Sequence, residues 1–222
     1  MIEEEISVLK QEMAANANPT KAVNMATYLK NKFNCFGIKS PVHKEIQKKW
    51  LTRIKPQKHN HWDVIYNLWA LDEREFHYIA IDYLNKTPKA KIAATDHKNL
   101  EELITTHSWW DSVDSIASNY VGKYFQAFPE KRDEVIKRWS QSDNMWLNRT
   151  CLIFQLKYKD DVDFELLKEL IKQFQPDKQF FIQKAIGWSL RQYSKFNSKA
   201  VADFINEIEL TGLARREASK YI

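Results

Sequence analysis

The chain of 222 residues carries 34 basic and 29 acidic side chains, a net charge of +5, and only four glycines and six prolines. So few turn-forming residues argue against a β-rich fold with many tight turns. The mild basic excess permits a nucleic-acid partner without requiring one. We expect an all-helical protein that is long enough to fold alone.

The cysteines and the amino terminus indicate the compartment. Cys35 and Cys151 lie in hydrophobic segments without CxxC spacing, so neither a disulfide framework nor a zinc site is indicated. The amino-terminal segment MIEEEISVLKQ is acidic and amphipathic, unlike a signal peptide. No later run approaches the roughly 18 apolar residues of a membrane span. We expect a cytoplasmic monomer that needs no cofactor or metal and does not enter a membrane.

Helical patterns follow one another along the chain. Residues 1–55 predict an amino-terminal helical cap, with helices in TKAVNMATYLKNKF and SPVHKEIQKKWL. Over residues 56–222, apolar residues recur at three-to-four spacing, as at Leu100, Leu103 and Ile104. Polar breaks such as NKTPKAK, QAFPEKRD and QFQPDKQ separate these stretches at regular distances.

The regular breaks reflect a repeat of 35 residues. The aligned positions are Phe76, Asp111, Trp146, Phe181 and Arg216. Each lies in a predicted helix that follows a shorter helix and a polar turn. Such a unit is typical of an α-solenoid of the HEAT or armadillo kind. We expect one domain over residues 1–222, with about five repeats over 56–222 and a concave groove. A compact irregular bundle with a coincidental step is the alternative.

The segment HSWWDSVDSIA sets two tryptophans beside two carboxylates. Trp110 and Asp114 are one helical turn apart, so they share a face. Trp109 points about 100° away and is predicted to be a core or capping residue. Ser108 is the candidate N-cap, and Asp111 suits the first turn, where the helix dipole favours a negative charge.

The repeat brings further residues into register with Asp114. Arg149 lies 35 residues later, Lys184 lies 35 beyond that, and Trp188 follows Lys184 by one turn. Equal positions of successive repeats become neighbours in a solenoid. The residues expected on one face are Trp110, Asp114, Arg149, Lys184, Trp188 and Ser219. In the alternative interpretation the tryptophans are buried packing residues, Asp114 caps a turn, and Arg149 forms a structural ion pair.

Several segments together resemble a known family over nearly the whole chain. They are FGIKSP, HSWWDSVDSIA, WLNRTCLIFQL and IQKAIGWSLRQYSK. The chain resembles the AlkD-type alkylpurine DNA glycosylases, bacterial DNA alkylation repair enzymes built from HEAT-like repeats. The resemblance implies that Asp114 is the catalytic carboxylate and Arg149 its neighbouring arginine, with Trp110 and Trp188 as the active-site tryptophans. Tyr28, in MATYLKNKF, matches a further aromatic residue at the groove.

The resemblance also implies a reaction and a partner. The family hydrolyses the N-glycosidic bond of cationic N3- or N7-alkylated purines, such as 3-methyladenine and 7-methylguanine, in double-stranded DNA during base excision repair. Asp114 would oppose the charge of an oxocarbenium-like transition state. Arg149 and Lys184 suit contacts with DNA phosphates. We expect a monofunctional glycosylase with no need to flip the base into a pocket.

The alternative function is a non-enzymatic helical-repeat scaffold that binds nucleic acid or a peptide in its groove, since repeat folds host many functions. Asp114 discriminates between the two, because a scaffold has no reason to hold a carboxylate in a DNA-binding groove.

Overall fold

The computed structural model describes residues 2–222 and contains two compact units, unit 1 over Met1–Thr87 and unit 2 over Pro88–Ile222. The regular elements of residues 2–222 are helices, apart from an isolated bridge between Asn34 and Glu73. The prediction of an all-helical protein is therefore confirmed, whereas the prediction of a single domain stays a prediction.

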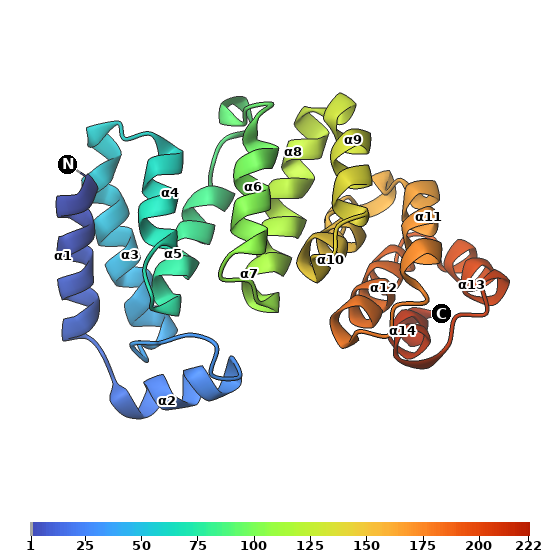
Figure 1. Ribbon diagram of the computed structural model, residues 1–222, viewed down its shortest axis with the longest axis horizontal. Coiled ribbons are helices and arrows are strands. Elements are labelled where there is room, and N and C mark those ends of the chain that lie inside the picture. The colour runs from blue at the N-terminus through green and yellow to red at the C-terminus, as the bar shows by residue number, and fades with distance from the viewer. Residues whose placement is uncertain (1) are drawn as a thin grey trace. The chain divides into compact units, whose positions relative to one another are not determined.

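Unit 1 contains the amino-terminal helices (Figure 1). Its elements are α1 (Ile2–Ala15), α2 (Pro19–Tyr28), α3 (Ser40–Ile54), the short η1 (Lys55–Gln57), α4 (His61–Trp69) and α5 (Arg74–Asn85). The buried residues Ile6, Leu9 and Met13 of α1 recur at helical spacing, and α1 packs on α3. There Trp50 Nε1 donates to the carbonyl of Glu5 at 2.8 Å. The helices predicted within residues 1–55 correspond to α2 and α3.

A buried carboxylate holds the loop between α2 and α3, whose last four residues, 36–39, begin the segment FGIKSP. Glu75 accepts hydrogen bonds from the backbone N–H groups of Phe36, Gly37 and Ile38 at 3.1, 2.9 and 3.3 Å. Gly37 has φ +77°, and a Cβ atom there would lie 2.3 Å from the carbonyl oxygen of Asn18. Only glycine fits this position. The loop therefore fixes where α3 begins.

Unit 2 is a succession of helix pairs (Figure 1). Its elements are η2 (Lys89–Lys91), α6 (Asp96–Thr105), α7 (Trp110–Ser115), the π-helical η3 (Ile116–Val121), α8 (Gly122–Ala127), α9 (Pro129–Ser140), α10 (Met145–Ile153), η4 (Lys159–Asp161), α11 (Phe164–Phe174), α12 (Phe180–Tyr193), α13 (Ser198–Glu207), α14 (Gly212–Ala218) and η5 (Ser219–Tyr221).

The helix starts reproduce the repeat seen in the sequence. The second helices α5, α7, α10 and α12 begin at residues 74, 110, 145 and 180, and α14 begins only 32 residues later, at 212. Within unit 2 these second helices contact one another in chain order, α7 with α10, α10 with α12, and α12 with α14. This is the packing of an α-solenoid, as predicted. The first helix is not always the shorter one, because α9 has 12 residues and α10 has nine.

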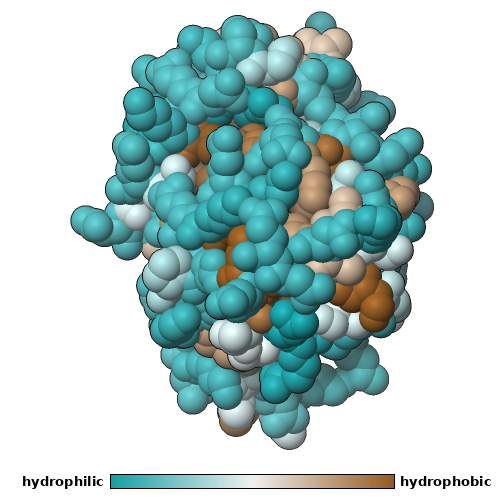
Figure 2. Space-filling view, turned by 90° about the vertical axis from the view of Figure 1, so that its right-hand side faces the viewer, coloured by the Kyte–Doolittle hydropathy of each residue, from teal (hydrophilic) through white to brown (hydrophobic). Residues whose placement is uncertain are grey.

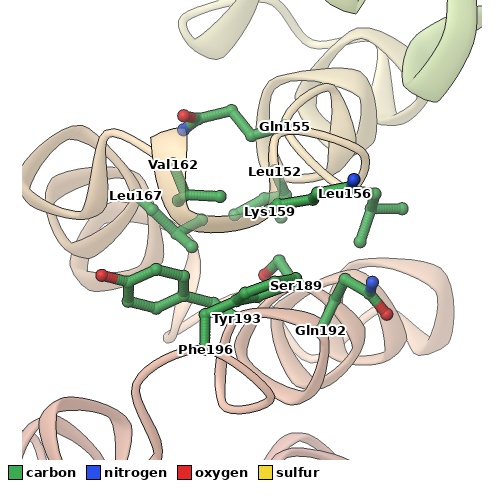
Figure 3. A pocket seen from close by; sticks show the side chains of 10 residues that line it. All are labelled: Leu152, Gln155, Leu156, Lys159, Val162, Leu167, Ser189, Gln192, Tyr193 and Phe196. Carbon is green, nitrogen blue, oxygen red and sulfur yellow. The ribbon is translucent and has the colours of Figure 1, made fainter.

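Apolar side chains fill the space between the pairs. Figure 3 shows Leu152, Val162, Leu167 and Tyr193 closing on one another where α10, η4, α11 and α12 meet. The gap between them is about 10 Å³, which is the space of one water molecule. We therefore regard this gap as core packing and not as a ligand site.

One face of the molecule is mainly hydrophilic (Figure 2). The face shown in Figure 2 carries small, separate hydrophobic patches among polar side chains. No helix within residues 2–222 is long and apolar enough to cross a membrane. The exposed large apolar residues include Tyr28, at 67% exposure, and Phe180, at 59%. Phe180 lies at the mouth of a pocket described next.

Candidate active site

One pocket of unit 2, of about 360 Å³, gathers the predicted site residues of that unit. It is lined by Trp110, Asp114, Arg149, Phe180, Phe181, Lys184, Trp188, Arg191 and Glu217, and we call it the Asp114 pocket. These residues come from α7, α10, α12 and α14. The structure thus brings together the carboxylate, the two bases and the two tryptophans that share a register in the sequence.

The start of α7 positions Trp110 and Asp114. The helix begins at Trp110, so Asp114 follows by one turn and the two side chains share a face. Asp111 lies in the first turn, as predicted, and its Oδ1 accepts from the N–H of Ser112 at 2.9 Å. The prediction that Ser108 caps this helix is wrong. Its hydroxyl instead donates to the carbonyl of Ile104 at 2.7 Å, because the preceding helix ends there.

Trp109 occupies the N-cap position of α7 and has a structural role. Its ring packs edge-on against the rings of Trp146 and Phe181, with centroids 5.8 and 5.2 Å apart. Trp146 and Phe181 are themselves 5.1 Å apart. Aromatic contacts of this kind stabilise by about 0.5–1.5 kcal/mol each beyond area burial. This cluster joins α7, α10 and α12 beside the pocket, in keeping with the prediction of a core or capping residue.

A wide turn follows Asp114. The π-helical segment η3 begins two residues later, and the hydroxyl of Ser118 donates to the carbonyl of Asp114 at 2.7 Å. Single π turns inside α-helices are frequent at functional sites because they reorient the side chains around them. The turn closes at Gly122, where a Cβ atom would lie 2.8 Å from the carbonyl oxygen of Phe154.

Asp114 and Arg149 form a two-pronged ion pair. Arg149 Nε donates to Asp114 Oδ1 at 2.7 Å, and Arg149 Nη2 donates to Asp114 Oδ2 at 2.8 Å. The third guanidinium nitrogen, Nη1, donates to the carbonyl of Phe181. The two side chains are only 5% and 15% exposed, for Arg149 and Asp114 respectively. Arg149 is therefore engaged on all three nitrogens and fixes the carboxylate plane.

The surroundings of Asp114 shift its titration. Burial raises the pKa of Asp114, whereas the hydrogen bonds and the charge of Arg149 lower it, and the negative charge of Asp111 raises it further. The net direction is upward from 3.8. Burial therefore destabilises the ionised form of Asp114 by more than the single cation Arg149 stabilises it.

The other buried carboxylate of the pocket, Glu217, is surrounded by cations. Its Oε1 accepts from Lys184 Nζ at 3.0 Å, and its Oε2 accepts from Arg191 Nη1 at 2.7 Å and Lys220 Nζ at 2.9 Å. The hydrogen bonds from Lys220 and Lys184 lower the pKa of Glu217 to about 2. Glu217 is thus ionised and holds two cations at the pocket.

A glycine allows this arrangement. A Cβ atom on Gly187 of α12 would lie 2.4 Å from the Cβ of Glu217 and 2.8 Å from the carbonyl oxygen of Ala214. Only a residue without a side chain lets α12 and α14 approach so closely. The close crossing brings the carboxylate of Glu217 beneath Lys184 and Arg191.

The sequence interpretation did not include Phe180, Phe181, Arg191 and Glu217. Arg191 follows Lys184 by seven residues, two helical turns, so the same phase argument would have found it. Glu217 was missed because the last repeat is shorter than 35 residues. Ser219, expected on this face from a constant step, instead begins η5 and does not line the pocket.

Tyr28, the aromatic residue that the resemblance places at the groove, lies in unit 1. It is the last residue of α2 and lines a separate hollow with Asn24, Met25, Leu29 and Tyr78. Its assignment to DNA binding stays a prediction.

The charges of the Asp114 pocket suit two kinds of ligand. Arg149, Lys184 and Arg191 face two carboxylates, Asp114 and Glu217, which leaves one positive charge in excess. Lys184 and Arg191 can contact an anion, while Asp114 presents a negative charge in the same pocket as Trp110 and Trp188. Within residues 2–222, no group of three or more His, Cys, Asp or Glu side chains is placed to hold a metal ion.

Comparison with known proteins identifies the family. The family model described as DNA alkylation repair enzyme matches residues 9–222. The chain is also similar to the solved structure of a predicted DNA alkylation repair enzyme from Enterococcus faecalis, with 32% identity and a TM-score of 0.84 over 93% of this chain and 97% of that one. Comparison with curated proteins finds no match. The family model covers nearly all of the chain, and the chain therefore belongs to the family of DNA alkylation repair enzymes.

Proposed function

We propose that this protein is a DNA glycosylase that hydrolyses the N-glycosidic bond of N3- or N7-alkylated purines in duplex DNA. The observation that carries this proposal is the carboxylate of Asp114, held in a plane by Arg149 in a pocket bordered by Trp110 and Trp188. A fixed, largely buried carboxylate with an aromatic border suits a reaction in which positive charge develops on a sugar.

The substrate class follows from the charge of the leaving base. A purine alkylated at N3 or N7 is cationic, so it leaves without strong general-acid assistance. The sugar then acquires oxocarbenium character, and a carboxylate beside it lowers the energy of that state. Asp114 is suited to this role, and a carboxylate lone pair that Arg149 does not use can accept a hydrogen bond from the attacking water, so that Asp114 acts as a general base. Arg149 acts as a positioning residue for the carboxylate.

The tryptophans favour cationic over neutral substrates. Trp110 and Trp188 are half-buried, so part of each indole borders the pocket. An indole face attracts a cation by about 0.5 to 2 kcal/mol, according to how far the pair is desolvated. A neutral base or sugar gains nothing from this attraction.

The remaining cations suit the DNA backbone. Lys184 and Arg191 are tethered by Glu217 yet keep 37% and 25% of their side-chain surface exposed. Their unused N–H donors can contact a phosphate and hold the lesion in register without reading sequence. Arg149 has less scope for a phosphate contact, because its guanidinium already has three partners.

The experiment measures release of 7-methylguanine from methylated duplex DNA by the wild type and by Asp114→Asn, under single-turnover conditions. Asparagine keeps one acceptor for Arg149 but removes the charge. We expect base release to fall by about 100-fold to 1000-fold. The control is Asp143→Asn, because Asp143 is exposed and lies outside the pocket.

Two outcomes would contradict the proposal. Equal rates for Asp114→Asn and Asp143→Asn would remove Asp114 from the chemistry. A wild type that binds duplex DNA but releases no base would favour the scaffold function instead.

A further inference from the structure

The helix that carries Asp114 contains the π-helical segment η3. The segments α7, η3 and α8 follow one another without a break over residues 110–127, and the backbone angles are helical at both junctions. Within residues 2–222, every other helical segment is either α-helical or 3₁₀. We propose that Ser118 and Asn119 of η3 are positioning residues for Asp114, because they keep this turn wide.

Burial along this helix repeats every four residues. Four pairs of neighbouring residues are buried, namely Ser112 with Val113, Ile116 with Ala117, Tyr120 with Val121, and Tyr124 with Phe125. The pairs between them, Asp114 with Ser115 and Ser118 with Asn119, are half-buried. An α-helix has about 3.6 residues per turn, so a period of four drifts by about 40° per turn, or about 120° over three turns. A regular α-helix would therefore not keep the two faces apart.

The wide turn removes this drift. In a π-helix each N–H group bonds to the carbonyl five residues earlier instead of four, so the turn holds more residues than an α-helical turn. Because η3 lies between α7 and α8, α7 can present Trp110 and Asp114 to the pocket while α8 keeps Tyr124 and Phe125 buried. If η3 were wound as an α-helix, one of the two ends would have to rotate.

Contacts outside the helix hold its second half in place. The hydroxyl of Tyr120 donates to Asp96 Oδ2 at 2.8 Å, and the hydroxyl of Tyr124 donates to the carbonyl of Ala94 at 2.7 Å. Both tyrosine side chains are also fully buried, so this half cannot rotate without losing core packing. A change in the winding of η3 would therefore rotate α7, and Asp114 with it.

Two neighbouring side chains of η3 bond to the backbone one turn earlier. Ser118 Oγ donates to the carbonyl of Asp114 at 2.7 Å, and Asn119 Nδ2 donates to the carbonyl of Ser115 at 2.8 Å. A side chain that donates to the carbonyl four residues earlier competes with the backbone N–H group for that carbonyl and bends the helix. Two such donors at consecutive positions favour the π hydrogen-bond pattern over the α pattern.

Lys157 fixes the orientation of the Asn119 amide. Its Nζ donates to Asn119 Oδ1, so the NH₂ group of the amide faces the carbonyl of Ser115. The opposite orientation would place the NH₂ group against an ammonium group. Lys157 comes from the segment between α10 and η4. The neighbouring repeat thus supports the wide turn as well.

A single bond of this kind does not widen a helix. Asn67 Nδ2 donates to the carbonyl of Asp63 at 2.9 Å in α4, and Thr150 Oγ1 donates to the carbonyl of Trp146 at 2.8 Å in α10. Both helices are α-helical at these positions. In η3, by contrast, two consecutive donors coincide with a burial period of four. We therefore expect the loss of both donors to have a larger effect than the loss of either one.

This inference rests on the proposed function, because it assigns positioning residues to the same carboxylate. The variants are Ser118→Ala, Asn119→Ala and the double variant of the full-length protein. The control is Asn67→Ala, because Asn67 makes the same bond in an α-helix of unit 1 and lies outside the pocket. Alanine is a better helix former than serine or asparagine, so the variants should fold, which urea denaturation checks.

The rate of 7-methylguanine release in a single turnover and the dissociation constant for the methylated duplex are measured separately. A misplacement of about 1 Å costs about 100-fold in rate, so we expect about that loss for the double variant and about 10-fold for each single variant. The dissociation constant should stay the same, because Lys184 and Arg191 lie on another helix. Ser118→Thr should recover most of the rate, since a helical threonine can donate to the same carbonyl.

A second readout does not depend on base release. The indole N–H resonance of Trp110, assigned with Trp110→Phe, should move in the double variant and stay in place in Asn67→Ala, since α7 rotates only in the former. If the wild type is active, a double variant as fast as Asn67→Ala would overturn the inference, and so would a loss confined to the dissociation constant. If the Trp110 resonance moves as expected but the wild type releases no base, the role of Ser118 and Asn119 stands and the proposed glycosylase does not.

Discussion

Two carboxylates of the Asp114 pocket have opposite surroundings. Asp114 has one cationic partner and is largely buried, so its pKa is raised. Glu217 accepts hydrogen bonds from three cations, so its pKa is lowered to about 2. Both residues lie on second helices of unit 2. Burial dominates the pKa shift of Asp114, whereas attraction to cations dominates that of Glu217.

This difference separates a reactive group from a structural one. Three protein cations, Lys184, Arg191 and Lys220, pair with Glu217, so its negative charge exerts little attraction on a ligand. The negative charge of Asp114 is compensated once, and the space beside it is bordered by indole rings. Pairs of titratable groups whose pKa values are pushed apart often divide roles in this way. The following predictions test whether Asp114 and Glu217 differ as described.

The largest effect is expected when Asp114 loses its cation. In Arg149→Leu the carboxylate stays buried without a charged partner, which should lower the free energy of unfolding by about 3 kcal/mol at pH 8. The pKa of Asp114 then rises further, so the carboxyl group becomes protonated as the pH falls. The loss should therefore shrink at pH 5, where the neutral acid needs no cation. Urea denaturation at the two pH values measures both quantities.

A matched surface pair provides the control for Arg149→Leu. Lys199 and Asp203 are 86% and 65% exposed and form an i,i+4 pair on α13. Lys199→Met should leave the free energy of unfolding nearly unchanged at either pH, because water and salt screen an exposed pair. If Arg149→Leu is no worse than this control, the pair with Asp114 is not the buried ion pair that its geometry indicates.

The close crossing of α12 and α14 should also be sensitive. Gly187→Ala forces a Cβ atom against Glu217 and Ala214, so α14 must move away. We expect a loss of about 2 kcal/mol in the free energy of unfolding, as for overpacked cores. The sign of this change distinguishes the two cases, because alanine in place of glycine stabilises a helix that has room for the Cβ atom by roughly 0.5–1 kcal/mol. A stabilised variant would show that α14 does not need this contact.

Much of this arrangement could be predicted from the sequence because it depends on period and phase. A constant step of 35 residues paired Asp114 with Arg149, and the two are hydrogen-bonded in the structure. One-turn spacing placed Trp110 with Asp114 and Trp188 with Lys184, and all four line one pocket. Helical periodicity carries this information because equal positions of stacked repeats become neighbours.

The rest depended on features that leave no periodic signal. Because the last repeat is short, Glu217 occupies the position expected for Ser219. No sequence pattern indicates that the spacing between α12 and α14 is shorter than 35 residues. The sequence interpretation assigned Arg149 to a phosphate contact and gave its ion pair with Asp114 only as the alternative, whereas the structure gives its guanidinium three protein partners. Side-chain partners of this kind are set by tertiary packing, which a single sequence does not reveal.

A smaller effect is expected from the charge of Glu217. In Glu217→Gln the amide retains hydrogen bonds but not the ion pairs, and we expect a loss of about 1 kcal/mol in the free energy of unfolding at pH 7. Because the pKa of Glu217 is lowered from 4.5 to about 2, the wild-type contribution is complete above about pH 4.5 and is lost as the pH falls toward 2. The difference between the two proteins should therefore vanish at the acid end of a urea-denaturation series. A constant difference across that range would mean that Glu217 acts through packing and not through charge.

The smallest and most specific effect concerns the pH dependence of base release. The negative charge of Asp111 helps to raise the pKa of Asp114, and only ionised Asp114 opposes a sugar cation. Asp111→Asn removes that charge but keeps an acceptor for the N–H of Ser112. The pKa of Asp114 should then fall, so the acid limb of the kcat/KM profile should move to lower pH by a few tenths of a unit, as expected for one partly screened charge. Asp133→Asn, at an exposed site outside the pocket, should leave the limb in place. An acid limb that stays in place in Asp111→Asn as well would mean that a group other than Asp114 controls it.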